Sequence, residues 1–117
     1  MSRMQKMTYD FVFGAADTVI TKFADQNGYI TDILIKNPAN TNSVTAALSI
    51  QDNEAYELYN SGAKNASTTT HIPSDMAAEV ADIPCDIKSK LVLTLSGVPG
   101  GAGTTVRVNL YFKTTKY

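Results

Sequence analysis

TTVRVNLYFK, residues 104 to 113, alternates between apolar and polar side chains from Val106 onward. A period of two places every second side chain on the same face of an extended strand. The apolar face would carry Val106, Val108, Leu110 and Phe112, and the opposite face would carry Arg107, Asn109, Tyr111 and Lys113. This stretch therefore predicts a half-buried β-strand whose apolar face packs on a core.

A second strand is predicted just before it. Residues 88 to 96, KSKLVLTLS, place Leu91, Leu93 and Leu95 on one face. The intervening residues 97 to 103, GVPGGAG, contain four glycines, which tolerate positive φ, and a proline, which presets a turn. We therefore expect the two strands to pair as an antiparallel hairpin around this loop.

Three further strands are predicted in the middle of the chain. Residues 28 to 36, GYITDILIK, form an aliphatic and β-branched run that begins in the turn dipeptide Asn27-Gly28, which predicts a central strand. Residues 43 to 51 alternate again, and the turn-rich segment before them predicts a hairpin with that central strand. Residues 54 to 60 are expected to add a third strand to the same meander, with Tyr56 and Leu58 sharing a face.

The remaining segments are shorter or more polar. Residues 8 to 13 and 18 to 23 predict two strands, one for each of two sheets. Residues 60 to 74 are expected to form a polar loop, residues 74 to 80 a helical turn capped by Ser74, and residues 80 to 87 an edge strand, because Pro84 lacks an N–H. The polar segment 1 to 7, which contains three methionines, predicts a flexible N-terminal arm, followed by one domain over residues 8 to 117.

Length and composition agree with one small folded domain. The chain has 117 residues, of which 44% are apolar and 18% are charged, so it can bury one core and is too apolar to be disordered. Seven or eight short strands with no long helical pattern predict an all-β fold. We expect a two-layer antiparallel β-sandwich, with jelly-roll connections as one option.

Several classes of partner are disfavoured by the sequence. The net charge is −1 and the ten basic residues are scattered, so we expect no nucleic-acid partner. No apolar run approaches the roughly 20 residues needed to cross a bilayer, and no secretory signal is recognisable, so we expect no membrane association. Cys85 is the only cysteine, which excludes an intramolecular disulfide.

Residues with catalytic or metal-binding chemistry are few. His71 is the only histidine and has no partner nearby in sequence, while Cys85 lies between Asp82 and Asp86, which would disfavour its thiolate. Asp52, Glu54 and Glu57 surround a turn, but their spacing does not match a calcium-binding loop. The glycine-rich loop lacks the Lys-Ser/Thr ending of a phosphate-binding loop. We therefore predict no enzyme, no catalytic residue, no metal ligand and no cofactor.

Tyrosines are the best candidates for an interaction surface, because each combines a flat apolar ring with a polar tip. The candidates are Tyr29, Tyr56, Tyr59 and Tyr111. On the alternations described above, Tyr59 and Tyr111 would point away from the core.

The order of these segments carries a resemblance to a known group of proteins. A turn and strand beginning GYITDILIK is followed by TNSVTA, a D-N-E turn, YELYNSGA, and LTLSGVPGG before the last strand. This order resembles small β-sandwich proteins among the structural proteins of tailed bacteriophages. The resemblance implies a virion component, most plausibly a capsid decoration or cement protein that binds the major capsid protein, often as a trimer, and stabilises the shell.

Two other functions stay open at this point. One is a carbohydrate-binding module that uses Tyr29, Tyr56 or Tyr59 as a stacking platform, although the chain has no tryptophan. The other is a phage tail or baseplate protein, which sequence does not separate from a capsid protein.

Overall fold

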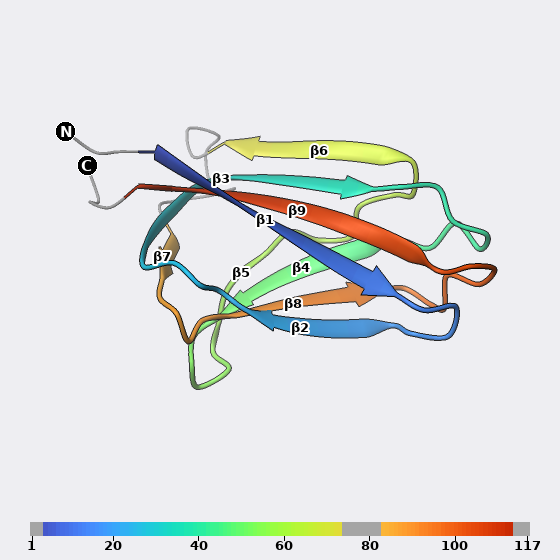
Figure 1. The fold of residues 1–117 in the computed structure, drawn as a ribbon, viewed down its shortest axis with the longest axis horizontal. Coiled ribbons are helices and arrows are strands. Elements are labelled where there is room, and N and C mark those ends of the chain that lie inside the picture. The colour runs from blue at the N-terminus through green and yellow to red at the C-terminus, as the bar shows by residue number, and fades with distance from the viewer. Residues whose placement is uncertain (1–3, 74–82, 114–117) are drawn as a thin grey trace.

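The computed structural model describes residues 4–73 and 83–113. Within them the chain forms strands and no helix (Figure 1). The nine strands are β1 (Met4–Phe13), β2 (Val19–Phe23), β3 (Gly28–Asn37), β4 (Ala46–Gln51), β5 (Glu57–Asn60), β6 (Thr68–Pro73), β7 (Ile83–Cys85), β8 (Lys90–Leu95) and β9 (Thr104–Lys113). No described segment is therefore a helix of the length and apolar character needed to cross a membrane.

The strands form two antiparallel sheets packed face to face, so the predicted β-sandwich is confirmed. Sheet A has the order β1-β9-β3-β6, with β7 also pairing with β3, and sheet B has the order β2-β8-β4-β5. Most consecutive strands belong to opposite sheets, and each sheet joins strands that are far apart in sequence. Two four-stranded sheets connected in this way have the arrangement of a jelly roll, to which β7 is an addition.

Two of the predicted hairpins are wrong. β8 and β9 belong to different sheets, as do β3 and β4, so neither pair is hydrogen-bonded. The loops between them cross from one sheet to the other instead. Each of these strands has one strongly apolar face. Two such faces are buried more completely when the strands lie in opposite sheets that pack face to face than when the strands pair side by side in one sheet. The hairpin of β4 with β5 is confirmed.

Gly103 shows why the loop before β9 needs its glycines. Its φ is +87°, a conformation that residues with a side chain rarely adopt, and a Cβ atom here would collide with the carbonyl oxygen of Phe13. The glycine lets the chain pass beside the end of β1 as it enters sheet A.

One strand was not predicted. β6 lies within the segment expected to be a polar loop, and it pairs with β3 through Asp32 to Asn37. Its sequence, TTTHIP, has a single large buried apolar residue, Ile72. An edge strand with so little apolar surface gives no alternation signal, although its threonines favour extended backbone. The helical turn predicted for residues 74 to 80 lies outside the described residues. β7 is an edge strand, as Pro84 predicted.

The predicted arm over residues 1 to 7 is wrong for residues 4 to 7. β1 begins at Met4, which pairs with Lys113, and the register continues without a shift to Phe13 opposite Thr104. Met7 packs against the core from this strand. The segment is mostly polar, so its sequence did not indicate that every second residue faces inward.

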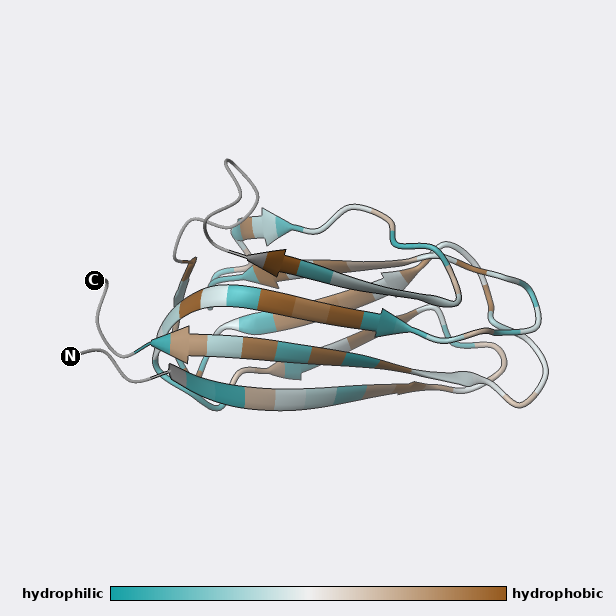
Figure 2. Cartoon of the chain, turned by 90° about the horizontal axis from the view of Figure 1, so that it is seen from above, coloured by the Kyte–Doolittle hydropathy of each residue, from teal (hydrophilic) through white to brown (hydrophobic). Residues whose placement is uncertain are grey.

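The core lies between the two sheets and is made by the predicted inward faces. Figure 2 shows apolar and polar residues alternating along the strands. Leu48, Leu93 and Leu110 are fully buried, as are the rings of Phe11, Phe13 and Phe112. On the opposite face of β9, Arg107 is exposed and its Nε donates to Asp10 Oδ1 at 2.8 Å.

The register of β9 predicts unequal effects of two substitutions. Leu110→Ala removes a fully buried side chain and should lower the free energy of unfolding by about 2 to 5 kcal/mol, because the cavity it leaves cannot collapse completely. Arg107 is open to water and is paired with the partly exposed Asp10, so Arg107→Ala should cost far less. Urea denaturation measures both. Equal shifts of the unfolding midpoint would mean that the strand register is wrong.

Candidate functional site

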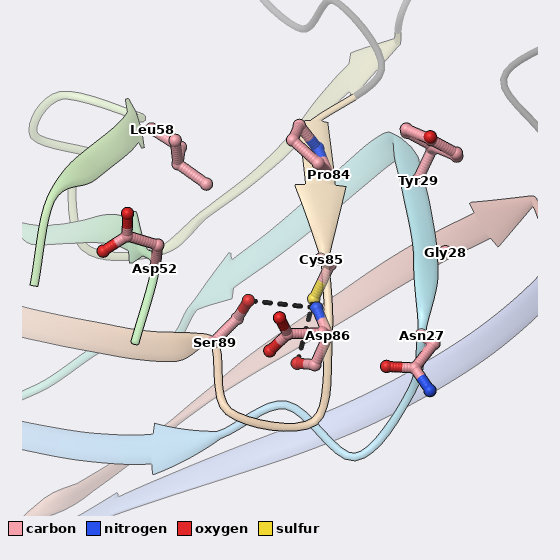
Figure 3. A pocket seen from close by; sticks show the side chains of 9 residues that line it. All are labelled: Asn27, Gly28, Tyr29, Asp52, Leu58, Pro84, Cys85, Asp86 and Ser89. Carbon is pink, nitrogen blue, oxygen red and sulfur yellow. Dashed lines mark hydrogen bonds between the residues drawn. The ribbon is translucent and has the colours of Figure 1, made fainter. Parts of the chain in front are cut away.

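A cavity of about 520 Å³ opens at the end of the sandwich that carries β7 (Figure 3). Its size falls within the range of small-ligand sites, which is roughly 300 to 1,000 Å³. One wall is formed by Asn27 to Tyr29 at the start of β3, and the opposite wall by Asp52 and Leu58 at the β4–β5 turn. The segment from Pro84 to Asp86, together with Ser89, lies between the two walls. Residues from both sheets therefore meet here.

Hydrogen bonds hold the loops around the cavity in place. The hydroxyl of Tyr9, on β1, donates to Asp25 Oδ1 at 2.7 Å and so ties the β2–β3 connection to sheet A. Burial, followed by this hydrogen bond, raises the pKa of Tyr9, because both disfavour the phenolate. Asn27 Oδ1 accepts from the backbone N–H of Ile87 at 3.2 Å, which joins the same connection to the β7–β8 turn.

Two small buried side chains, Cys85 and Ser89, line the cavity. Ser89 Oγ accepts from the backbone N–H of Asp86 at 3.0 Å, and the Cys85 thiol points toward the carbonyl of Asp86 at 3.8 Å. Burial raises the pKa of Cys85 to about 11, and the nearby carboxylates of Asp86 and Asp25 add to the rise. The sequence suggested the flanking carboxylates as the cause, whereas burial is the larger one; Asp82 lies outside the described residues.

Two aspartates line the cavity, and each uses one carboxylate oxygen to stabilise a turn. Asp52 Oδ1 accepts from the backbone N–H groups of Glu54 and Tyr56, both at 2.9 Å. Asp86 Oδ1 accepts from the backbone N–H of Lys88 at 2.7 Å. Neither Oδ2 atom is hydrogen-bonded to another described residue, so each can accept from a ligand.

The four candidate tyrosines do not form one patch. Tyr29 lines the cavity, and Tyr56 is 69% exposed in the neighbouring β4–β5 turn. Tyr111 lies on the outer face of sheet A, away from the core as predicted. The prediction for Tyr59 is wrong: it pairs with the fully buried Ile50 and packs against the core.

A register shift explains the orientation of Tyr59. The pairing of β4 with β5 shifts between Ile50 and Gln51, so that Glu57 lies opposite Gln51. The shift leaves Tyr56 outside the strand, and it reverses the face on which the alternation alone would place Tyr59.

His71 has a partner that the sequence did not reveal. Its Nε2 lies 2.9 Å from Asp32 Oδ2 on the outer face of sheet A, where β3 and β6 are paired. The His71 side chain is 54% exposed, and no hydroxyl or thiol of a described residue is hydrogen-bonded to the ring. A histidine and a carboxylate without a nucleophile do not make a catalytic triad.

The other sequence candidates have structural roles. Glu57 Oε2 accepts from Ser49 Oγ at 2.6 Å and from Asn60 Nδ2 at 3.1 Å, so this carboxylate is engaged within sheet B. No group of three histidine, cysteine, aspartate or glutamate side chains among residues 4–73 and 83–113 is arranged to hold a metal ion. In the glycine-rich loop, the N–H of Gly100 donates to the carbonyl of Ala15 at 3.0 Å, which links this loop to the β1–β2 turn.

Comparisons with known proteins do not assign the chain to a family. No family model matches it, and no curated protein matches it. Among solved structures, it is similar to an arabinose-bound α-L-arabinofuranosidase, with 15% identity and a TM-score of 0.46. The match covers 91% of this chain and 19% of that chain, so this chain spans about a fifth of the enzyme's length.

The raised pKa of Cys85 predicts a slow thiol. A rise from the usual 9.0 to about 11 lowers the thiolate fraction at neutral pH about a hundredfold, and the thiolate is the reactive form. Iodoacetamide should therefore modify the folded protein at pH 8 at least about a hundredfold more slowly than the protein unfolded in urea. The rate should increase with pH until the pH approaches 11. Equal rates for the folded and unfolded protein, followed by mass spectrometry, would contradict the buried position of the thiol.

Proposed function

We propose that this protein is a non-enzymatic structural component of a tailed-bacteriophage virion, acting as a capsid decoration or cement protein. In this role it binds the major capsid protein and stabilises the shell. The proposal combines the resemblance in segment order with the character of the molecular surface, and jelly-roll folds are used by viral capsid proteins. Because one fold serves many functions, the surface matters more than the fold.

The outer face of sheet B is the observation that carries the proposal. Its exposed side chains on β2 are Val19, Thr21 and Phe23, and the neighbouring strand β8 adds Val92 and Thr94. None of these is charged, and Val19 and Phe23 are 54% and 60% exposed. Lys90, opposite Phe23, and Glu57, opposite Gln51, are charged and lie at one end of this face. The remainder of the face can be buried against a protein without leaving a charge unpaired.

The outer face of sheet A is different. It carries the ion pairs of Arg107 with Asp10 and of His71 with Asp32, together with Lys6 and Lys36. Such a face is well suited to water. The contrast between the two faces makes sheet B the side that we assign to the shell.

Self-association would make attachment stronger. A single sandwich offers a patch on the order of 800 Å² to each partner, which by itself gives modest affinity. A trimer would present three equal surfaces to equivalent capsid sites at once, and linked contacts raise the overall affinity without a stronger single contact.

The alternatives have weaker support. A carbohydrate-binding platform built from Tyr29, Tyr56 and Tyr59 requires rings that share one surface, and Tyr59 packs against the core instead. A tail or baseplate protein would use the same face of sheet B, so it differs from the proposal only in the partner.

Co-sedimentation tests the proposal directly. The purified protein should pellet with particles of its parent phage from which this component has been stripped, and it should sediment as a trimer when alone. Thr94→Lys places a charge on the outer face of sheet B, between Val19 and Ala47, and should abolish pelleting with the particles. Thr105→Lys, the same change at an exposed position of β9 in sheet A, is the matched control and should leave pelleting unchanged.

Two results would contradict the proposal. A strictly monomeric protein that never pellets with the particles would remove the decoration function. Equal loss of pelleting in both lysine variants would show that sheet B is not the docking face.

A further inference from the structure

We propose that the cavity at the β7 end of the sandwich binds an arginine side chain of a partner protein, and that the apolar residues around its rim pack against the residues flanking that arginine. This inference deepens the proposed function, because it rests on the protein acting by binding other proteins. It concerns a different surface from the outer face of sheet B.

The charge of the cavity selects a cation. Asp52 and Asp86 line it from two different turns, and no basic side chain is among its lining residues. Each carboxylate has an Oδ2 atom that makes no hydrogen bond to another described residue, while its Oδ1 atom is held by backbone N–H groups. The two carboxylates are therefore fixed in position before a ligand arrives, which reduces the entropy lost on binding.

The apolar parts of the cavity select a long side chain rather than a bare ion. Leu58 and Pro84 offer contacts for an aliphatic stem, and Tyr29 offers an aromatic ring. A guanidinium group bonds carboxylates through several N–H groups in a fixed plane, and it stacks on aromatic rings more readily than an ammonium group does. An arginine side chain can contact the acidic, the aliphatic and the aromatic residues of this lining.

Two large apolar side chains are exposed in the turns beside the cavity. Tyr56 and Ile87 are 69% and 58% exposed, and they are two of the six large apolar side chains that are exposed among the described residues. Each is connected to the cavity lining through the backbone. Tyr56 N–H donates to Asp52 Oδ1, and Ile87 N–H donates to Asn27 Oδ1.

A pocket surrounded by exposed apolar residues is the usual form of a protein-binding hot spot. Aromatic residues and arginine dominate such sites, and the surrounding contacts exclude water from the central ion pair. Removal of water on binding would strengthen the attraction between the guanidinium group and a carboxylate of the cavity.

Peptide titrations followed by NMR test this inference on the full-length protein. The probe is the blocked tripeptide acetyl-Leu-Arg-Leu-amide, whose leucines reproduce the apolar flanks. It should shift the amide signals of Asn27, Asp52, Asp86 and Ser89, with a dissociation constant on the order of millimolar for so small a contact. The same peptide with neutral citrulline in place of arginine should bind at least about tenfold more weakly. Raising the salt concentration should also weaken binding of the arginine peptide.

Substitutions to asparagine separate charge from structure. Asp52→Asn and Asp86→Asn keep the Oδ1 acceptor that holds each turn and remove the negative charge, so the fold should survive and the double variant should bind the arginine peptide about tenfold more weakly. Asp17→Asn is the matched control. Asp17 Oδ2 likewise accepts a turn N–H, that of Gly14 at 2.8 Å, but in the β1–β2 turn. This variant should bind the peptide as the unmodified protein does.

Three results would overturn the inference. The first is binding of the citrulline peptide as tight as that of the arginine peptide. The second is a loss of affinity in the control variant as large as that in the double variant, and the third is a set of shifts that maps to another surface. Shifts of the cavity residues with maltotriose and none with the arginine peptide would identify a sugar site instead.

The two proposals fail independently. If the double variant loses the peptide but still pellets with phage particles, the cavity serves a partner other than the shell and the decoration function stands. If the double variant binds the peptide normally, the cavity inference is wrong whatever the particles show.

Discussion

The contact between the inward faces of the two sheets is the interaction on which the rest of the structure depends. Each sheet has one apolar face, and no disulfide or described metal site adds to the stability. Leu93 and Leu48 from sheet B and Leu110 and Ile33 from sheet A are fully buried in the shared core. Burial of these side chains supplies most of the favourable free energy of folding. The strands that carry them are therefore divided between two facing sheets, and the loops connect one sheet to the other.

This constraint also creates the two ends of the molecule, where loops from both sheets meet. At one end, the turns after β2, β4 and β7 bring Asn27, Asp52 and Asp86 around a single cavity, although they are far apart in sequence. At the other end, the loops are joined by backbone hydrogen bonds, such as that of Asn42 with Pro99. The side chains that form the core lie on the strands, so the residues of the turns are free to differ in chemistry.

Alternation along single strands was sufficient to predict the strands with strongly apolar faces and the inward orientation of Leu110. It could not predict pairing, because β8 and β9 each present the same pattern whether they lie side by side or in opposite sheets. It also missed β6, where threonines leave little apolar signal, and it placed Tyr59 on the wrong face because a register shift cannot be read from one strand. Of the cavity, only Tyr29 was predicted as a site residue. Asn27, Asp86 and Ser89 are ordinary turn residues in sequence, and only the topology brings them together.

The position of β9 has a consequence for how the protein is made. β9 is the last described strand in the chain, yet it lies between β1 and β3 and pairs with both along most of its length. During synthesis, β1 and β3 therefore emerge long before the strand that joins them. Until β9 leaves the ribosome, β1 has no strand to pair with in sheet A, and β3 can pair only with β6 and β7. Folding then requires contacts across almost the whole chain, which makes it slow. The growing chain should depend on chaperones during this interval, when exposed strands can pair with those of neighbouring chains.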